Sequence, residues 1–392
     1  MTDAPGTTDQ GTTERRSPLD EVHRAEGASF TDFAGWQMPV RYSSDLAEHH
    51  AVREHSGLFD LSHMGEIVVV GPEAADSLDY ALAGKLSAIA EGQAKYSLLL
   101  ARDGGVIDDL VVYRTGPDRF MVVANAANRH VVAEELRART APFETEVFDE
   151  SDDIALIALQ GPDALEVLQQ TEGFGIEGPG NDEEDFVAAV AALKYYRALP
   201  ATFEGEPVLV ARTGYTGEDG FELYVAPDRA KTLWDALRET GGPRVVPCGL
   251  ASRDTLRLEA GMPLYGHELG RDIFPVQAGL GRVVALSKEG DFVGREAIEQ
   301  GPAADAPVLV GLTAEGRRAP RAGYAVFDGD GEDARRVGEV TSGALSPTLG
   351  HPVAMAFVAP DLTEAGTALF VDVRGTRMPA SVTALPFYKR GA

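Results

Sequence analysis

Two adjacent carboxylates, Asp108 and Asp109, interrupt an apolar run that follows a pair of glycines and ends at Tyr113. The β-branched and aromatic residues 110–113 predict a strand. Side chains alternate faces along a strand, so the two carboxylates are expected to point to opposite sides of the sheet. The one that points inward needs a partner, a ligand or a raised pKa. The alternative is a turn that leaves both carboxylates in solvent.

A second candidate for chemistry is a pair of arginines on one predicted helix, which covers residues 248–260. Arg253 and Arg257 lie four residues apart and therefore share a helix face, among leucines. Arginine in this setting suits the recognition of a carboxylate. An ion pair with a neighbour such as Asp254 or Glu259 explains the same pattern equally well.

Two other polar patterns have simpler explanations. The stretch 212–220 places three glycines around Tyr215, but it lacks the Lys-Ser/Thr ending of a phosphate-binding loop and is compatible with a plain hairpin turn. The predicted helix 46–55 carries three histidines, of which no two are four residues apart as in a helical zinc site. A charged helix face is the favoured interpretation of this helix.

The elements that position these residues follow a recurring pattern of an apolar strand, a proline with an acidic residue, and an amphipathic helix. This pattern begins near residues 67, 156 and 221. Proline suits a first helical turn, and an acidic residue there complements the helix dipole. Other segments are expected to be strands (95–100, 104–113, 119–124, 188–193 and 207–211), loops (30–39 and 173–185), and a helix capped by residues 125–128. The combination predicts an α+β fold with antiparallel sheets.

The C-terminal part of the chain has a different pattern. Residues 300–307 are rich in glycine, proline and alanine and form a candidate linker. Beyond them helical periodicity is almost absent, and six strands are expected, over residues 308–312, 325–328, 337–341, 354–358, 368–373 and 380–384. Such a pattern predicts a small β-barrel or sandwich.

Composition limits the class of protein. The 62 acidic and 35 basic residues give a net charge of -27, which argues against binding to nucleic acid. The single cysteine, Cys248, excludes an internal disulfide. No apolar run approaches the roughly 20 residues of a membrane helix, and residues 1–16 lack the apolar stretch of a signal peptide, so we expect a disordered tail and a cytoplasmic protein. The dispersed acidity suggests a salt-rich cytoplasm as a hypothesis.

Nine stretches of the chain together resemble one family, the aminomethyltransferases (T-proteins) of the glycine cleavage system. They are FAGWQMP (33–39), GLFDLSHMGE (57–66), KYSLLL (95–100), GGVIDDLVVYR (104–114), VANAAN (123–128), IALQGP (157–162), RTGYTGEDGFEL (212–223), CGLASRDTLRLEAGMPLYGHEL (248–269) and TSGALSPTLG (341–350). The resemblance implies a three-domain cloverleaf around a folate-binding funnel. The domains are expected at 17–64 with 151–268, at 65–150 with 269–304, and at 305–392.

The resemblance also implies a reaction. The aminomethyl group held by the lipoylated H-protein would give its methylene to tetrahydrofolate, with release of ammonia, and neither a metal nor pyridoxal phosphate is implied. Two alternatives remain within the wider superfamily. One is a folate-dependent demethylase of a small methylated substrate. The other is a non-catalytic folate-binding iron–sulfur assembly factor, whose typical cysteine-containing stretch is absent at residues 212–219.

Site residues are carried over from the resemblance position by position. Asp109 matches the carboxylate that would orient the reacting folate nitrogen and stabilise positive charge that develops there. Asp108 would face the other side of the strand. The residues implied to bind folate are Tyr96, Asn125, Tyr215, Glu222, Arg253 and, near the loosely matched chain end, Tyr388.

Overall fold

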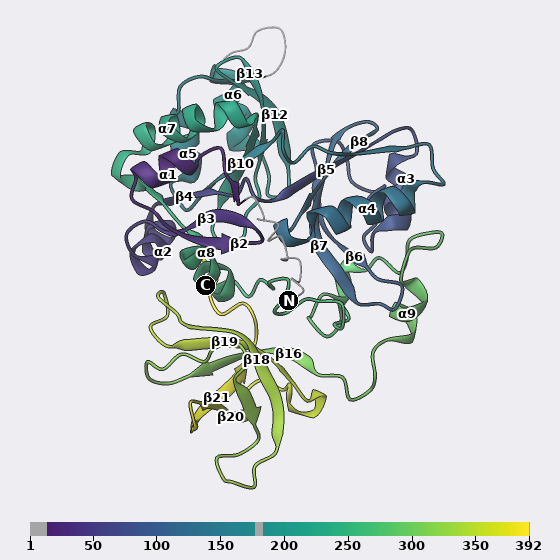
Figure 1. Cartoon of the computed structure of the whole chain (residues 1–392), viewed down its shortest axis with the longest axis vertical. Coiled ribbons are helices and arrows are strands. Elements are labelled where there is room, and N and C mark those ends of the chain that lie inside the picture. The colour runs from purple at the N-terminus through teal and green to yellow at the C-terminus, as the bar shows by residue number, and fades with distance from the viewer. Residues whose placement is uncertain (1–13, 177–182, 392) are drawn as a thin grey trace, which may run out of the picture.

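The computed structural model describes residues 14–176 and 183–391, which form two large sheets with helices and a separate barrel (Figure 1). The first sheet has seven strands in the order β11-β12-β13-β14-β10-β4-β15. Its strands are β4 (Ser56–Asp60), β10 (Ala155–Gln160), β11 (Phe174–Ile176), β12 (Ala198–Phe203), β13 (Glu206–Ala211), β14 (Gly220–Val225) and β15 (Val245–Pro247). Only the pair of β4 and β15 is parallel.

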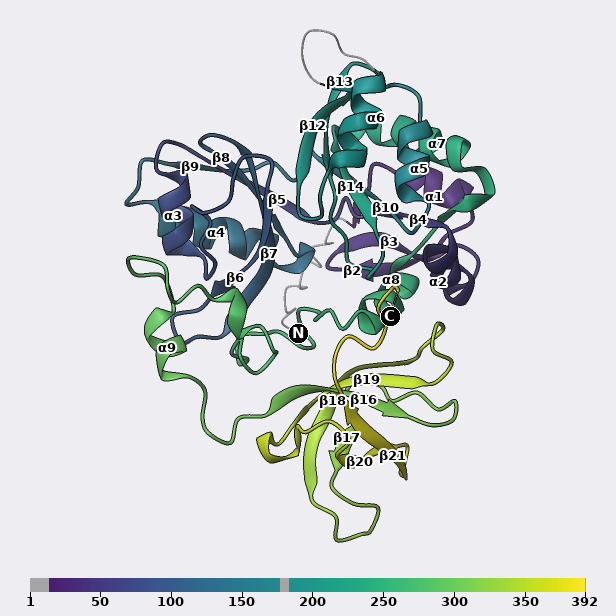
Figure 2. The ribbon, with the colours of Figure 1, turned by 180° about the vertical axis from the view of Figure 1, so that it is seen from behind.

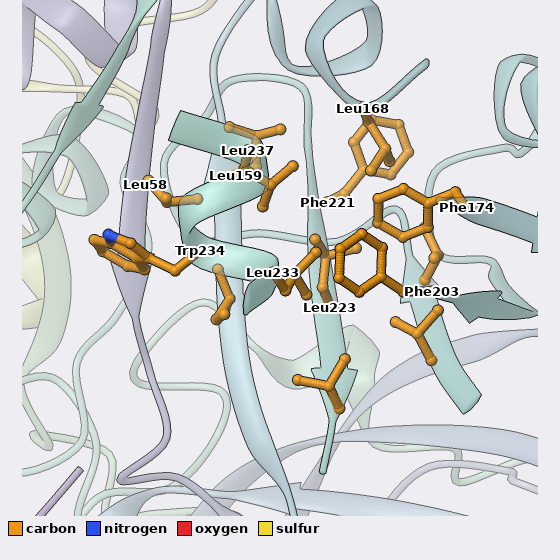
Figure 3. Packing of buried hydrophobic residues seen from close by; sticks show 14 of the residues in the cluster. Leu58, Leu159, Leu168, Phe174, Phe203, Phe221, Leu223, Leu233, Trp234 and Leu237 are labelled. Carbon is orange, nitrogen blue, oxygen red and sulfur yellow. The ribbon is translucent and has the colours of Figure 1, made fainter. Parts of the chain in front are cut away.

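The core of the first sheet lies beneath four helices, α1 (Asp20–Ala25), α5 (Ala164–Gln170), α6 (Glu183–Ala192) and α7 (Ala230–Gly241). Figure 3 shows Leu233, Trp234 and Leu237 of α7 packed among leucines and phenylalanines of the strands. The spacing of these three residues places them on one helix face, which is why α7 is amphipathic. Strand β10 has no exposed residue, because its other face packs toward the second sheet.

The second sheet has five strands in the order β6-β7-β8-β5-β9. They are β5 (Gly65–Val70), β6 (Ala94–Leu100), β7 (Val106–Gly116), β8 (Arg119–Ala124) and β9 (Glu146–Asp149), accompanied by helices α3 (Ala74–Ala81) and α4 (Arg129–Thr140). Figure 2 shows the helices of both sheets on their outer sides. A core that contains Val68 and Tyr113 from the second sheet and Leu156 and Tyr224 from the first therefore joins the inner faces.

The C-terminal part is a closed six-stranded antiparallel barrel in the order β16-β19-β18-β17-β20-β21. Its strands are β16 (Val308–Ala314), β17 (Ala325–Phe327), β18 (Arg336–Leu345), β19 (Pro352–Val358), β20 (Ala368–Val373) and β21 (Thr376–Thr383). All six strands predicted here are confirmed, and barrel closure leaves no open sheet edge. The α+β fold class with a β-barrel is likewise confirmed. The exact domain boundaries remain a prediction.

The remaining elements connect these units. Helix α8 (Leu250–Glu259) packs between α2 (Asp45–Glu54) and barrel strands β18 and β19. Helix α9 (Arg295–Gln300) precedes the barrel. Short 3₁₀ turns lie at η1 (Ala126–Asn128), η2 (Pro227–Arg229), η3 (Gly242–Arg244), η4 (Gly281–Val283) and η5 (Pro360–Leu362).

Three local predictions were wrong. Residues 30–39 are not a loop but most of a hairpin, β2 (Ser29–Phe33) and β3 (Trp36–Arg41), which turns through residues with positive φ at Ala34 and Gly35. Residues 188–192 of the predicted strand 188–193 belong to helix α6, which buries Phe186 and Val190 one turn apart. The predicted loop 173–185 contains β11 and the start of α6, and residues 177–182 lie outside the described part of the chain.

The predicted tail and the histidine-bearing helix also need correction. Residues 1–13 lie outside the described part, but Arg15–Arg16 form strand β1, parallel to β3. Helix α2 does not simply present a charged face, because Glu48, His49 and Arg53 are buried. His49 contacts Glu259 of α8 at 3.1 Å and Thr348 of the barrel at 2.9 Å, so this helix instead joins the first sheet to the barrel.

Candidate functional site

The candidate site begins on strands β6 and β7, where Tyr96 and Asp109 meet. These antiparallel strands pair Tyr96 with Val111 and Leu98 with Asp109. Tyr96 and Asp109 are therefore diagonal neighbours on one face of the sheet, the arrangement that lets a long side chain reach across strands. The Tyr96 hydroxyl donates a hydrogen bond of 3.0 Å to Oδ2 of Asp109.

One amide joins the two adjacent carboxylates. Nδ2 of Asn125, at the end of β8, lies 2.9 Å from Oδ1 of Asp108 and 2.9 Å from Oδ1 of Asp109. Alternation along β7 places Asp108 on the face of Leu110 and Val112 and Asp109 on the face of Val111 and Tyr113, and both carboxyl groups nevertheless reach this amide. The predicted helix is confirmed, with Asn128 at the N-cap position of α4, but the side chains of Asn125 and Asn128 make no cap hydrogen bond and donate to the carboxylates instead.

Burial favours the protonated form of both carboxyl groups. Asp108 is fully buried, and its burial, followed by the charge of Asp109, raises its pKa to about 7. Burial also raises the pKa of Asp109, against hydrogen bonds from Tyr96 and Asn125 that lower it. The pair therefore exchanges a proton near neutral pH, which suits acid–base chemistry.

Glu222 supplies a third carboxylate from the facing sheet. It lies on β14, opposite Ala158 and Ala211, and Oε2 accepts hydrogen bonds from Thr213 Oγ1 at 2.5 Å and from the Tyr113 hydroxyl at 3.3 Å. Tyr113 belongs to β7 of the second sheet. The Glu222 carboxylate therefore lies where the inner faces of the two sheets meet.

Arg253 and Tyr215 form the next part of the site. The Arg253 guanidinium lies 5.0 Å from the centre of the Tyr215 ring, whose hydroxyl donates to the backbone oxygen of Pro263. A buried NH1 atom of Arg253 has no hydrogen-bond partner among the described residues. Burial lowers the pKa of Arg253, and the charge of Glu222 opposes that shift, so Glu222 lies within electrostatic reach. This half-buried guanidinium, with one buried nitrogen that lacks a hydrogen-bond partner among the described residues, is ready to receive an anionic or polar ligand group.

Arg257, one turn along α8, has the other role considered for this pair. Its NH1 lies 3.0 Å from Glu268, and its NH2 lies 2.7 Å from Asp254 and 2.7 Å from Ser342 of the barrel. Arg257 is thus a paired structural residue, as the ion-pair alternative expected.

The structure brings six of the seven predicted residues toward one region. The charge of Asp109 helps to raise the pKa of Tyr215, although burial is the main cause, so Tyr215 links Asp109 to Arg253. Tyr388 lies elsewhere: its ring stacks on Arg53 at 4.2 Å, and its backbone N–H donates to the oxygen of Glu259 at 2.8 Å. The described contacts of Tyr388 are therefore with Arg53 of α2 and with the backbone at the end of α8.

Sequence reasoning missed Tyr196 at this site. Burial is the main cause of its raised pKa, to which the charges of Glu222 and Asp109 contribute. It adopts a φ of 59°, which is unusual for an aromatic residue and marks local backbone strain of the kind that gathers at functional sites. Nothing in the stretch around residue 196 signals this conformation, because the usual sign of a positive φ is glycine.

Two classes of site find no support in the part of the chain that the structure describes. No group of three or more His, Cys, Asp or Glu side chains there is arranged to hold a metal ion. No helix among residues 14–176 and 183–391 is long and apolar enough to cross a bilayer.

Comparisons with known proteins give one consistent result. The family model described as "GCVT N-terminal domain" matches residues 19–288, and "Glycine cleavage T-protein C-terminal barrel domain" matches residues 308–389. An aminomethyltransferase of Cutibacterium acnes is 60% identical over 379 residues, covering 97% of this chain and 100% of that protein. One of Streptomyces coelicolor is 53% identical over 382 residues, covering 96% and 98%.

A solved structure agrees with this result. The crystal structure of glycine cleavage system aminomethyltransferase T from Bartonella henselae superposes with a TM-score of 0.84 at 37% sequence identity. The match covers 96% of this chain and 99% of that one.

Proposed function

The chain belongs to the glycine cleavage T-protein family, and from that premise we propose that it is a tetrahydrofolate-dependent aminomethyltransferase. In the proposed reaction, the methylene of an aminomethyl group on the lipoyl arm of H-protein passes to tetrahydrofolate, with release of ammonia. The observation that carries the proposal is the convergence of Asp109, Glu222 and Arg253 from three separate elements.

The residues present suit a folate. A reduced pterin offers N–H and amino groups, which are donors, and the Glu222 carboxylate is an acceptor at the meeting point of the two sheets. The tail of folate is anionic, and Arg253 has a buried NH1 group free among the described residues. Tyr96 and Tyr215 supply aromatic surface between these polar groups.

Asp109 is the proposed catalytic residue. As the folate nitrogen bonds to the incoming carbon, it gains positive charge and must lose a proton. A carboxylate held by Tyr96 and Asn125 would stabilise that charge without reorganising. Its raised pKa brings its proton affinity closer to neutral pH, where general base catalysis is most effective.

The test of the proposed function is turnover of aminomethyl-loaded H-protein. We expect release of ammonia and methylenetetrahydrofolate that depends on added tetrahydrofolate. Asp109→Ala should remove this transfer and retain the wild-type melting profile, whereas Asp118→Ala, an exposed aspartate on the following turn, should keep full turnover. Unchanged turnover in the Asp109→Ala variant would refute the role of Asp109. Folate binding by the wild type without turnover would favour the demethylase or the assembly-factor alternative.

A further inference from the structure

Asp108 is a buried carboxyl group of the candidate site that the proposed chemistry leaves unused. It is fully buried behind Asp109, and every hydrogen bond it receives comes from one short segment. Oδ2 accepts from the backbone N–H of Asn125 at 3.0 Å, and Oδ1 accepts from Nδ2 of Asn125 at 2.9 Å and from Nδ2 of Asn128 at 2.7 Å. The carboxylate thus fixes both the backbone and the side chain of Asn125.

The same Asn125 amide holds Asp109. Its Nδ2 donates at 2.9 Å to Oδ1 of Asp109 and lies 3.3 Å from the Asp109 backbone oxygen. An amide nitrogen has two hydrogens, and here one faces each carboxylate. A rotation of Asn125 that broke its bond to Asp108 would therefore also displace its bond to Asp109. The remaining hold on the Asp109 carboxylate, through Tyr96, leaves it free to pivot.

We propose that Asp108 is a positioning residue, which acts through Asn125 to set both the orientation and the ionisation of Asp109. This inference rests on the proposed transferase function and extends it to a residue with no contact to the reacting atoms. Two buried carboxylates linked by one amide cannot both carry a full charge at low cost, so the protonation state of one affects the protonation state of the other.

The groups that face the pair are known from every element that packs against it. They are Tyr96 from β6, Asn125 and Asn128 from the segment after β8, Tyr196 from the segment before β12, Tyr215 from the segment after β13, and Tyr265 from the segment after α8. The four tyrosines have raised pKa values, mainly through burial, and stay neutral across the working range. No cation contacts either carboxylate among the described residues, and Asp109 is the charge that raises the pKa of Asp108 after burial.

The first experiment is a double-mutant cycle. Asp108→Asn should lower kcat by about ten- to a hundredfold, with a change in KM for tetrahydrofolate of less than about threefold, because the site still binds folate but presents Asp109 poorly. In an Asn125→Ala background the same substitution should lower kcat by less than about twofold, since the hydrogen bonds that link Asp108 to Asp109 are already absent. Losses that multiply independently would overturn the proposal.

The second experiment does not depend on turnover. Carboxyl ¹³C NMR of aspartate-labelled protein would follow the titration of Asp109, assigned by its loss in Asp109→Asn. The hydrogen bond from Asn125 lowers the pKa of Asp109, so its displacement in Asp108→Asn should move this titration to higher pH, and the acid limb of the kcat profile should move with it. An unmoved titration would overturn the proposal, because a purely structural residue leaves it in place.

Two further arms keep the outcomes separate. If Asp108→Asn fails to fold, Asn128→Ala removes only one donor to Asp108, and it should lower kcat by about three- to tenfold, with no further loss in the Asn125→Ala background. If wild-type protein shows no folate-dependent turnover, the proposed function fails, while the NMR titration still decides whether Asp108 controls Asp109.

Discussion

Two arginines one helical turn apart have opposite surroundings, and the difference separates a binding residue from a structural one. Arg257 is paired with Glu268 and Asp254, whereas Arg253 stacks near Tyr215 with a buried nitrogen unpartnered in the described structure. The sequence places them on the same helix face, and so it favoured neither role for either residue. The distinction depends on Glu268 and Ser342, which only the fold brings to Arg257.

This difference predicts two separable effects. Arg253→Gln should raise KM for tetrahydrofolate about ten- to a hundredfold and leave the melting temperature near that of the wild type, because the half-buried guanidinium leaves NH1 without a hydrogen-bond partner among the described residues. Arg257→Gln should lower the free energy of unfolding by about 3–5 kcal/mol, because it leaves the buried Glu268 carboxylate without its ion-pair partner. Steady-state kinetics and urea unfolding of both variants measure this; a stable Arg257→Gln variant would contradict the assignment.

Glu66 predicts a dependence of stability on pH. It is fully buried on β5, neither carboxyl oxygen has a hydrogen-bond partner in the described residues, and burial raises its pKa well above the usual range. The folded state therefore retains a proton that the unfolded state releases at about pH 4.3, so stability is full below that pH and is lost as pH rises toward the folded pKa.

Glu66→Gln should remove this loss. Urea unfolding at pH 5 should give similar stability for the variant and the wild type, and at pH 9 the variant should be the more stable. Glu134→Gln, an exposed site on α4, is the control and should follow the wild type at both values. If the free energy of unfolding of the Glu66→Gln variant differs from that of the wild type by the same amount at pH 5 and pH 9, Glu66 does not change its protonation on unfolding.

At the scale of elements, β7 is held from behind by the segment that follows α8. The backbone N–H of Val106 donates to the oxygen of Gly270 at 3.0 Å, and a Cβ at Gly105 would lie 1.7 Å from the backbone oxygen of Arg271. Only glycine permits this approach. The position of β7, and with it that of Asp109, thus depends on a segment more than 150 residues further along the chain.

A matched pair of substitutions tests this contact. Gly105→Ala should push the segment off β7 and lower the free energy of unfolding by more than about 3 kcal/mol, since neither backbone can yield. Gly270→Ala lies in the same crossing, but its Cβ would meet nothing within 4 Å, so the change should stay within about 0.5 kcal/mol. Equal denaturation curves for the two variants would contradict the close approach.

What the sequence predicted at this scale depends on how local the signal was. The barrel strands and β5 to β8 were predicted because apolar alternation and turn residues occur within a few positions. Helix α6 was mistaken for a strand because alanines blur its period, and only burial of Phe186 and Val190 separates the two. The meeting of Asp108 and Asp109 at Asn125 follows from sheet pairing, which alternation along one strand cannot show.

For the whole molecule, the net charge of -27 predicts a strong response to salt. Exposed like charges repel in the compact state, and ions screen that repulsion over about 10 Å at 0.1 M. The melting temperature at pH 7 should therefore rise with KCl from low to molar concentration. The same titration at about pH 4.5, where carboxylates are partly neutralised, is the control and should show a smaller rise. No rise at pH 7 would end the salt-rich cytoplasm hypothesis.

Strand β4 has a consequence for how the protein is made. All five of its residues are buried, and its two neighbours are β10 and β15, which lie far along the chain. A ribosome that adds about 5–20 residues per second needs roughly 10–40 s to pass from Asp60 to Val245. The strands of the second sheet are contiguous over residues 65–149 and emerge within that interval. Translation thus completes the second sheet first, while β4 remains a hydrophobic segment whose partner strands β10 and β15 have not yet been made.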